Sequence, residues 1–263
     1  DEAESLLSEM KNNGIQPTVV TYNTLLDAYF KSNRPDAIDC AESLVREMND
    51  KRIRLTIVTY NQLIRAYCMS KQQNSLDKAH NLFQEIKKQG LKPNTWIYSS
   101  LMAAHLKKTK NPEQQVQHLF LEMKNAFEDG DVSLKPDIRI YGILLNSFSK
   151  SGNPEKASET LKEMVRMDQK PTTSDFNAVL EAWMRSGDPE ATSQVELGFL
   201  QMKQLAAANT FDCQPDIRTY DVAIAAIDRS GAPEAGEKTL QLLRELQQLS
   251  EQNPRDKSFL PTV

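Results

Sequence analysis

The sequence of 263 residues contains few glycines and few cysteines, and it has no long apolar run. Nine glycines are too few for a fold built mainly from loops and tight turns. The three cysteines, Cys40, Cys68 and Cys213, are far apart and odd in number, so they indicate neither a metal-binding pair nor a disulfide framework. No apolar stretch approaches the ~20 residues that cross a bilayer, and we therefore expect no membrane span.

The signatures of an enzyme are also missing. His80, His105 and His118 share no metal-ligand spacing with the cysteines, which argues against a zinc site. The sequence contains no glycine-rich phosphate loop, no nucleophile elbow and no catalytic pairing of cysteine with histidine. We therefore expect a protein that is not an enzyme and that uses no metal, cofactor or small-molecule substrate.

Positive charge is in slight deficit, with 32 Lys and Arg against 36 Asp and Glu. The net charge of −4 argues against a protein coated with positive charge for nucleic acid, but it leaves room for a local basic stripe. The first residue is Asp1 and lies within a helical pattern, so we expect the chain to be a fragment of a longer protein.

An internal repeat is the main positive signal. An aromatic residue recurs in one local context, at Tyr22, Tyr60, Tyr98, Tyr141, Phe176 and Tyr220. A proline stands five residues before five of the six, and two apolar residues follow each aromatic at the third and fourth positions. This spacing is typical of an amphipathic helix, which we name helix A.

A second helix, which we name helix B, is predicted after each helix A. Its signature is a small or branched apolar residue followed seven positions later by a larger one, which places both on one helical face. The pairs are Ala3/Met10, Ala41/Met48, Ala79/Ile86, Val116/Met123, Ala157/Met164, Val195/Met202 and Gly236/Leu243.

Prolines mark the expected starts of the helices B, because proline has no N–H to lose at the first helical position. They stand at Pro35, Pro112, Pro154, Pro189 and Pro233, each followed by an acidic residue. Successive aromatics are 35 to 44 residues apart, and the extra residues enter only at turns, as stacked hairpins require. The sequence therefore predicts an all-α, right-handed α-solenoid of tandem antiparallel helix hairpins, a tetratricopeptide-like superhelix.

Two segments, 19–29 and 57–64, look like the start of a pentatricopeptide repeat (PPR) motif, and two others, 82–86 and 90–94, look like its end. The chain thus resembles PPR proteins over essentially its whole length, as a P-type-like array with lengthened repeats. The resemblance implies one array over residues 1–263. It consists of a half repeat at 1–18 and repeats at 19–56, 57–94, 95–137, 138–172, 173–216 and 217–262.

The PPR resemblance implies that each repeat reads about one base of single-stranded RNA with two side chains. In that family one reader directly follows the aromatic, and the other ends the repeat. The pairs here are Asn23/Thr56, Asn61/Asn94, Ser99/Asp137, Gly142/Thr172, Asn177/Asp216 and Asp221/Thr262. The alternative is an ordinary polar residue in the first turn of a helix.

The family code implies a base for four of these pairs. From 5′ to 3′ it reads pyrimidine, pyrimidine with C favoured, G, an unassigned base, U and a second unassigned base. The two unassigned positions depart from the family pattern, because Gly142 has no side chain and Asp221 carries a carboxylate where an amide or hydroxyl is usual.

The resemblance also implies residues that flank the base, two positions before each aromatic. Val20 and Val58 fit this role, and Trp96 could stack on a base, although it could equally pack between repeats. Arg139 and Ser174 depart from the pattern, as does Arg218.

A basic stripe is predicted nine residues after the aromatics, at Lys31, Lys107, Lys150, Arg185 and Arg229. Cations in file along a solenoid would follow the phosphates of RNA. The alternative is a favourable charge in the last turn of helix A. The acidic excess would then lie on the convex face, which includes Glu47, Glu85, Glu122 and Glu163.

Three functions follow as hypotheses. The first is sequence-selective binding of single-stranded RNA in organellar RNA processing, stability or translation, with the mitochondrion or plastid implied by the resemblance alone. The second is a protein-binding scaffold, for example a structural subunit of an organellar ribosome or another complex. The third is the specificity arm of an RNA-processing enzyme.

Overall fold

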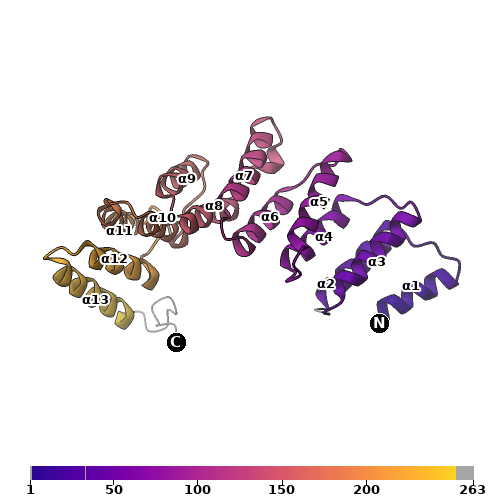
Figure 1. Cartoon of the computed structure of the whole chain (residues 1–263), viewed down its shortest axis with the longest axis horizontal. Coiled ribbons are helices and arrows are strands. Elements are labelled where there is room, and N and C mark those ends of the chain that lie inside the picture. Colours follow the sequence, from indigo (N-terminus) through magenta and orange to yellow (C-terminus); the bar gives the residue numbers. More distant parts are fainter. Residues whose placement is uncertain (1, 33, 253–263) are drawn as a thin grey trace. The chain divides into compact units, whose positions relative to one another are not determined.

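The computed structural model describes residues 2–32 and 34–252 and is helical throughout (Figure 1). These residues form thirteen α-helices and one short 3₁₀ helix, with no strand among them. The helices are α1 (Glu2–Asn12), α2 (Val19–Lys31), α3 (Ala37–Asp50), α4 (Ile57–Met69), α5 (Ser75–Lys88), α6 (Thr95–Lys108), α7 (Glu113–Glu128), η1 (Val132–Leu134), α8 (Ile138–Ser151), α9 (Pro154–Arg166), α10 (Thr173–Ser186), α11 (Ala191–Ala207), α12 (Ile217–Ser230) and α13 (Ala235–Gln252). The predicted all-α class of tandem helical hairpins is confirmed, and no described helix could cross a membrane.

The helices A are α2, α4, α6, α8, α10 and α12, and each begins at the first residue of a predicted repeat. In five of them the N-cap residue has an extended backbone conformation. These residues are Thr18, Thr56, Asp137, Thr172 and Asp216. The recurring proline of the pattern therefore stands one residue before the N-cap. There the missing N–H of proline removes no helical hydrogen bond, and its ring stops the helix from beginning earlier.

The helices B begin less regularly than predicted. In α9, Pro154 is the first helical residue, and the Asn153 side chain accepts from the backbone N–H of Lys156 at 3.3 Å, as the pattern indicates. By contrast, α3, α11 and α13 begin two residues after their prolines, so the predicted start is wrong there. In these three turns the backbone oxygen of the residue before proline accepts a hydrogen bond from the backbone N–H of the residue three positions later. The prolines thus occupy the second position of a β-turn, which the same fixed φ also suits.

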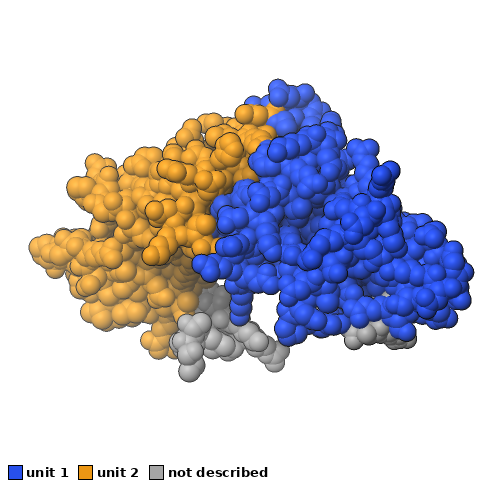
Figure 2. Space-filling model, turned by 45° about the vertical axis from the view of Figure 1, so that its right-hand side comes forward, with its two compact units in different colours: residues 1–107, 126–134 blue, residues 108–125, 135–263 orange. Residues whose placement is uncertain are grey.

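The helices fall into two compact units, shown in different colours in Figure 2. Unit 1 contains residues 1–107 and 126–134, and within it α2 packs on α3 and α4, and α4 packs on α5. Unit 2 contains residues 108–125 and 135–263. Within it α8, α10 and α12 form a row of helices A, against which α9, α11 and α13 pack. One continuous array over residues 1–263 stays a proposal.

The repeated aromatics and the anchors of the helices B form the cores. Tyr22, Tyr60 and Tyr141 are fully buried, and so are the anchors Met48 and Ile86. Burying a side chain of this size contributes about 1.5–3 kcal/mol, so the repeated pattern is what holds successive hairpins together. The anchor of α13 differs, because Leu243 is 47% exposed.

The hydroxyls of the core tyrosines donate to glutamates of the helices B. Each bond joins helix A to helix B of the same repeat. Burial by itself would raise the pKa of Glu47, but hydrogen bonds from Lys11, Lys51 and Tyr22 outweigh it and lower the pKa to about 2. These glutamates therefore connect the two helices of a hairpin and are only partly exposed, and their placement on a convex face stays a prediction. The pairs are Tyr22–Glu47, Tyr60–Glu85 and Tyr141–Glu163, with O···O distances of 2.8, 2.8 and 3.1 Å.

Candidate nucleic-acid interface

The two predicted readers of each repeat occupy two defined helical positions. The first reader is always the fifth residue of helix A, and the second is the residue directly before the next helix A. The second reader therefore lies at the N-cap of the following helix, at Thr56, Asn94, Asp137, Thr172 and Asp216. Thr262 lies outside the described residues. A residue at an N-cap has a structural task in any helix, since its side chain or neighbours must satisfy unpaired N–H groups.

Asn23 of unit 1 is held by the following helix A. Its carbonyl oxygen Oδ1 accepts from the hydroxyl of Thr59 at 2.8 Å, and its backbone oxygen accepts from the side-chain amide of Gln62 at 3.2 Å. Thr59 is fully buried, whereas Asn23 is half-buried. The amide of Asn23 therefore has a preferred orientation at the edge of the core.

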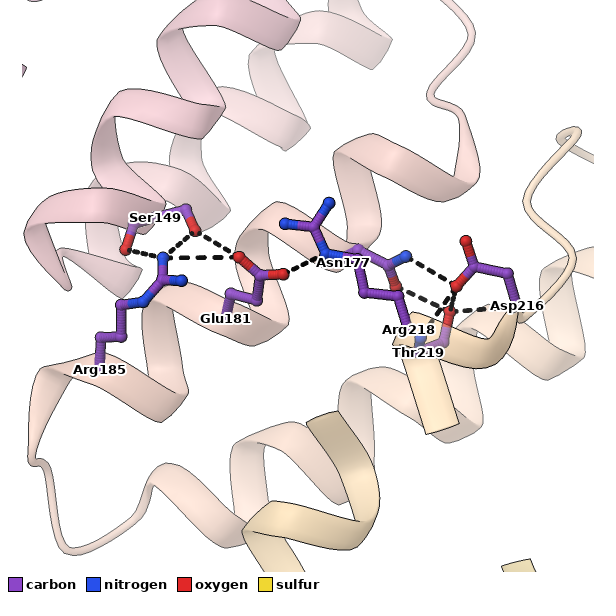
Figure 3. Close-up of polar contacts among 7 residues, drawn as sticks. All are labelled: Ser149, Asn177, Glu181, Arg185, Asp216, Arg218 and Thr219. Atoms are coloured by element: carbon purple, nitrogen blue, oxygen red, sulfur yellow. Dashed lines mark hydrogen bonds and ion pairs between the residues drawn. The ribbon is translucent and has the colours of Figure 1, made fainter. Parts of the chain in front are cut away.

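Asn177 and Asp216 of unit 2 are the one predicted pair whose side chains a hydrogen bond joins among the described residues. Asn177 Nδ2 donates to Asp216 Oδ1 at 3.0 Å, and Thr219 Oγ1 lies 2.8 Å from Asn177 Oδ1 as its donor (Figure 3). Asp216 also accepts from the backbone N–H of Thr219 at 2.9 Å, as an N-cap does. Asn177 is only 1% exposed and lies within the packed interior, whereas Asp216 is half-buried.

The remaining first readers have different surroundings. The side-chain oxygen of Asn61 is buried without a hydrogen-bond partner. Ser99 is 3% exposed and donates to the backbone oxygen of Trp96 at 3.0 Å. A Cβ built on Gly142 would lie 3.4 Å from Asp175 Oδ1, and Asp221 is exposed on α12.

The predicted base-flanking residues divide into exposed and packed side chains. Val20 and Val58 are 68% and 49% exposed, although each lies in the first turn of a helix whose aromatic is buried. Trp96 is half-buried, with the guanidinium of Arg65 6.0 Å from its ring centroid. The two valines are therefore available to an apolar ligand face, whereas Trp96 has a partner within the chain.

The predicted basic stripe is partly engaged in contacts between helices A. Arg185 Nη1 donates to the backbone oxygen of Ser149 on α8 at 3.0 Å, and Arg229 Nη1 donates to that of Met184 on α10 at 2.8 Å. Both acceptors lie in the last turn of the preceding helix A, where carbonyl groups lack helical donors. Lys31 pairs with Asp27 on its own helix at 2.6 Å, and Lys107 and Lys150 are exposed.

A charged cluster in unit 2 was not predicted from the sequence. Glu181 of α10 is 8% exposed and accepts from Arg218 Nε of α12 and from Ser149 Oγ of α8, the latter at 3.1 Å (Figure 3). Arg185 Nη1 lies 3.5 Å from the same carboxylate. One buried carboxylate thus links three consecutive helices A and forms ion pairs with two guanidinium groups.

Sequence reasoning also missed the third residue of helix A. In α2, α4, α10 and α12 its side chain accepts from the backbone N–H of the N-cap residue, which is half of a capping box, whereas Ile97 in α6 and Ile140 in α8 cannot. Thr59 does so for Thr56 at 3.2 Å, and Thr219 does so for Asp216 at 3.0 Å. The spacing of a polar residue three positions after Thr or Asp was the available signal.

No metal site accompanies these contacts in the part of the chain that the structure describes. Within residues 2–32 and 34–252, no group of three or more His, Cys, Asp or Glu side chains could hold a metal ion.

The sequence matches family models of one repeat class. A model of the PPR repeat family matches residues 1–31, 17–69 and 56–107, and a model of the PPR repeat matches residues 139–168. The chain belongs to the pentatricopeptide repeat family. No curated protein matches the PPR chain in the corresponding sequence search.

Solved PPR structures share the fold. The crystal structure of the pentatricopeptide repeat protein PPR10 from maize matches with a TM-score of 0.66 at 21% identity, covering 95% of this chain and 37% of PPR10. The PPR domain of Arabidopsis thaliana protein-only RNase P 1, in complex with tRNA, matches with a TM-score of 0.61 at 19% identity. That match covers 80% of this chain and 98% of the domain. PPR10 in complex with an 18-nt psaJ RNA element matches with a TM-score of 0.56.

Proposed function

We propose that this PPR chain binds single-stranded RNA sequence-selectively, with about one nucleotide per repeat, in organellar RNA processing, stability or translation. The observation that carries the proposal is the recurrence of small polar side chains at the fifth residue of helix A and at the next N-cap. Such side chains offer defined donors and acceptors to a base edge. The exposed Val20 and Val58 beside them offer an apolar contact for a base.

The family and the solved structures support this proposal. The chain belongs to the PPR family, and the matching structures include complexes of PPR proteins with RNA. Because the chain spans only 37% of PPR10, the role in the whole protein and its location in the mitochondrion or plastid are part of the proposal. Lys31, Lys107, Lys150, Arg185 and Arg229 would contact phosphates.

Exchanging one reader tests base selection. Asn177→Ser turns the Asn177/Asp216 pair into the same pair that stands at Ser99/Asp137, so preference at one nucleotide should move from U to G. We expect a change of about tenfold in the ratio of the two dissociation constants, which corresponds to 1.4 kcal/mol. The measurement is fluorescence anisotropy with synthetic RNAs that differ at that nucleotide.

Asn81→Ser on α5 is the matched control, because it makes the same substitution at an exposed helical position away from the readers. Unchanged base preference in Asn177→Ser, with RNA affinity retained, would rule out base reading at this repeat. The experiment separates recognition from packing, since a purely structural Asn177 would lower stability without changing the ratio.

A protein-binding scaffold is the second candidate, for example a structural subunit of an organellar ribosome. Two observations favour it: Asn177 and Ser99 are almost completely buried, and Arg185 and Arg229 already donate to helix ends. An array that binds no RNA at low salt, but that forms a stable complex with a protein, would support the scaffold.

A further inference from the structure

The third residue of each helix A differs among the repeats in its ability to donate a hydrogen bond. It is Thr59 after the repeat of Asn23, Ile97 after that of Asn61, and Thr219 after that of Asn177. Where threonine is present, its hydroxyl lies 2.8 Å from the carbonyl oxygen of the preceding asparagine. Where isoleucine is present, the carbonyl oxygen of Asn61 is buried without a hydrogen-bond partner.

We propose that the third residue of the following helix A is an additional specificity-determining position, because its hydroxyl sets which end of the asparagine amide faces the RNA. The inference rests on the proposed RNA binding and deepens it. The third residue does not contact the base in this proposal. It acts through the asparagine, so it is a positioning residue.

The hydrogen-bond chemistry around Thr59 supports one amide orientation. Thr59 Oγ1 accepts from the backbone N–H of Thr56 at 3.2 Å, which leaves its own hydrogen for Asn23 Oδ1 at 2.8 Å. A carboxamide offers a carbonyl acceptor at one end and an NH₂ donor at the other, and a half-turn exchanges them. With the carbonyl engaged by Thr59, Asn23 presents its NH₂ group, which selects base edges that offer an acceptor.

Asn61 lacks this restraint. The third residue of α6 is Ile97, which has no donor, and the N-cap residue Asn94 uses its side-chain oxygen to accept from the backbone N–H of Ile97 at 3.0 Å. A buried carbonyl oxygen without a donor is unfavourable, so no hydrogen bond to Oδ1 holds the Asn61 amide in one orientation. This asparagine should discriminate less between donor and acceptor edges than Asn23 does.

Asn177 has a second restraint that provides an internal comparison. Its NH₂ group donates to the carboxylate of Asp216 at 3.0 Å, and a carboxylate can only accept. Asp216 therefore holds the amide even when the hydroxyl of Thr219 is removed. Asn23 has Thr56 rather than an acidic residue as its paired reader, so its orientation depends more strongly on Thr59.

The test removes the hydroxyl at position 59 and introduces one at position 97. Thr59→Val removes the hydroxyl and keeps the branched shape, and Thr59→Ser keeps the hydroxyl. Ile97→Thr introduces a donor for Asn61, and Ile97→Val is its matched control without a donor. The full chain is used with an RNA that it selects from a randomised pool, and with the single-base variants of that RNA at the nucleotides assigned to repeats 19–56 and 57–94.

Base discrimination is the measured quantity, as the ratio of dissociation constants among the four bases at one nucleotide. Thr59→Val should reduce base discrimination at least threefold at the nucleotide of Asn23 and leave discrimination at the neighbouring nucleotide unchanged. Thr59→Ser should keep the discrimination of the unaltered chain. Ile97→Thr should raise it at least threefold at the nucleotide of Asn61, whereas Ile97→Val should not. Thr219→Val should have a smaller effect at its own nucleotide than Thr59→Val has.

A purely structural role for the third residue predicts a different result, because lost capping would weaken binding to every RNA equally. Uniform weakening in Thr59→Val, together with unchanged discrimination in Ile97→Thr, would overturn the inference and leave RNA binding intact. Absence of binding by the unaltered chain to any pool RNA at low salt would overturn the proposed function and this inference with it.

Discussion

At the scale of single residues, the glycines show how local backbone geometry decides the effect of a side chain. Gly142 lies inside α8 with a helical backbone, and an added Cβ would meet nothing closer than Asp175 Oδ1 at 3.4 Å. Gly152 follows the same helix at a φ of +65°, and an added Cβ would lie 2.8 Å from the backbone oxygen of Arg185. An added side chain is therefore tolerated at Gly142 and strained at Gly152, although one glycine lies within α8 and the other directly follows it.

Gly142→Ala should stabilise unit 2 by about 0.5–1 kcal/mol, because alanine has the higher helix propensity. Gly152→Ala should destabilise unit 2 by more than about 1 kcal/mol, because an L side chain disfavours the left-handed conformation and the backbone of Arg185 cannot move aside easily. Urea unfolding followed by circular dichroism measures both. A loss of stability in Gly142→Ala would show that the space beside Asp175 is smaller than the structure indicates.

At the scale of elements, Glu181 of α10 connects α8, α10 and α12 through hydrogen bonds and ion pairs. Its carboxylate accepts from Arg218 and from Ser149, and it lies 3.5 Å from Arg185. Both arginines are about half exposed, with side-chain exposures of 54% for Arg218 and 50% for Arg185. They could therefore turn toward a phosphate if the carboxylate did not hold them.

Glu181→Gln should raise RNA affinity and make binding more sensitive to salt. It removes the charge that competes with phosphate for two guanidinium groups, and each new phosphate contact adds about 0.7 to the slope of log K against log salt for a single strand. Glu159→Gln is the control, because it makes the same change of net charge at an exposed site on α9. Equal salt slopes in the two variants would contradict a role for Arg185 and Arg218 at the RNA.

At the scale of the whole molecule, the buried histidine of unit 1 makes stability depend on pH. His105 of α6 is 5% exposed, and its Nε2 lies 2.5 Å from that of His80 on α5. Burial, and then the charge of His80, lower the pKa of His105 from its ordinary value of 6.5 to about 4. The unfolded chain therefore binds a proton on this group at pH values where the folded chain does not.

The sign of the pH effect follows from this difference. The contribution of His105 is fully present above pH 6.5 and is lost as the pH falls from 6.5 toward 4, by about 3 kcal/mol at most. Urea unfolding at pH 7.5 and pH 4.5 should show this loss, and His105→Gln should reduce the difference between the two values. His118→Gln, at an exposed position of α7, should leave the pH dependence as it is.

The sequence by itself determined the repeat, since the apolar period and the turn residues act over short distances. The six helices A begin at Val19, Ile57, Thr95, Ile138, Thr173 and Ile217, which are the starts that the aromatic and proline spacing predict. The helical positions of the reader pairs follow from the same spacing. The starts of α3, α11 and α13 could not be predicted from the prolines, because the fixed φ of proline fits both a β-turn and a first helical residue.

Only the tertiary structure decided which polar groups meet. Thr59 and Asn23 are 36 residues apart, and Glu181 and Arg218 are 37 residues apart, so no local pattern relates them. The stacking of one helix A on the next brings a hydroxyl to an amide or a carboxylate to a guanidinium. It also turned two cations of the predicted stripe, Arg185 and Arg229, toward the ends of preceding helices. Hydrogen bonds depend on distance and direction in space, and a sequence specifies those only after its helices have packed.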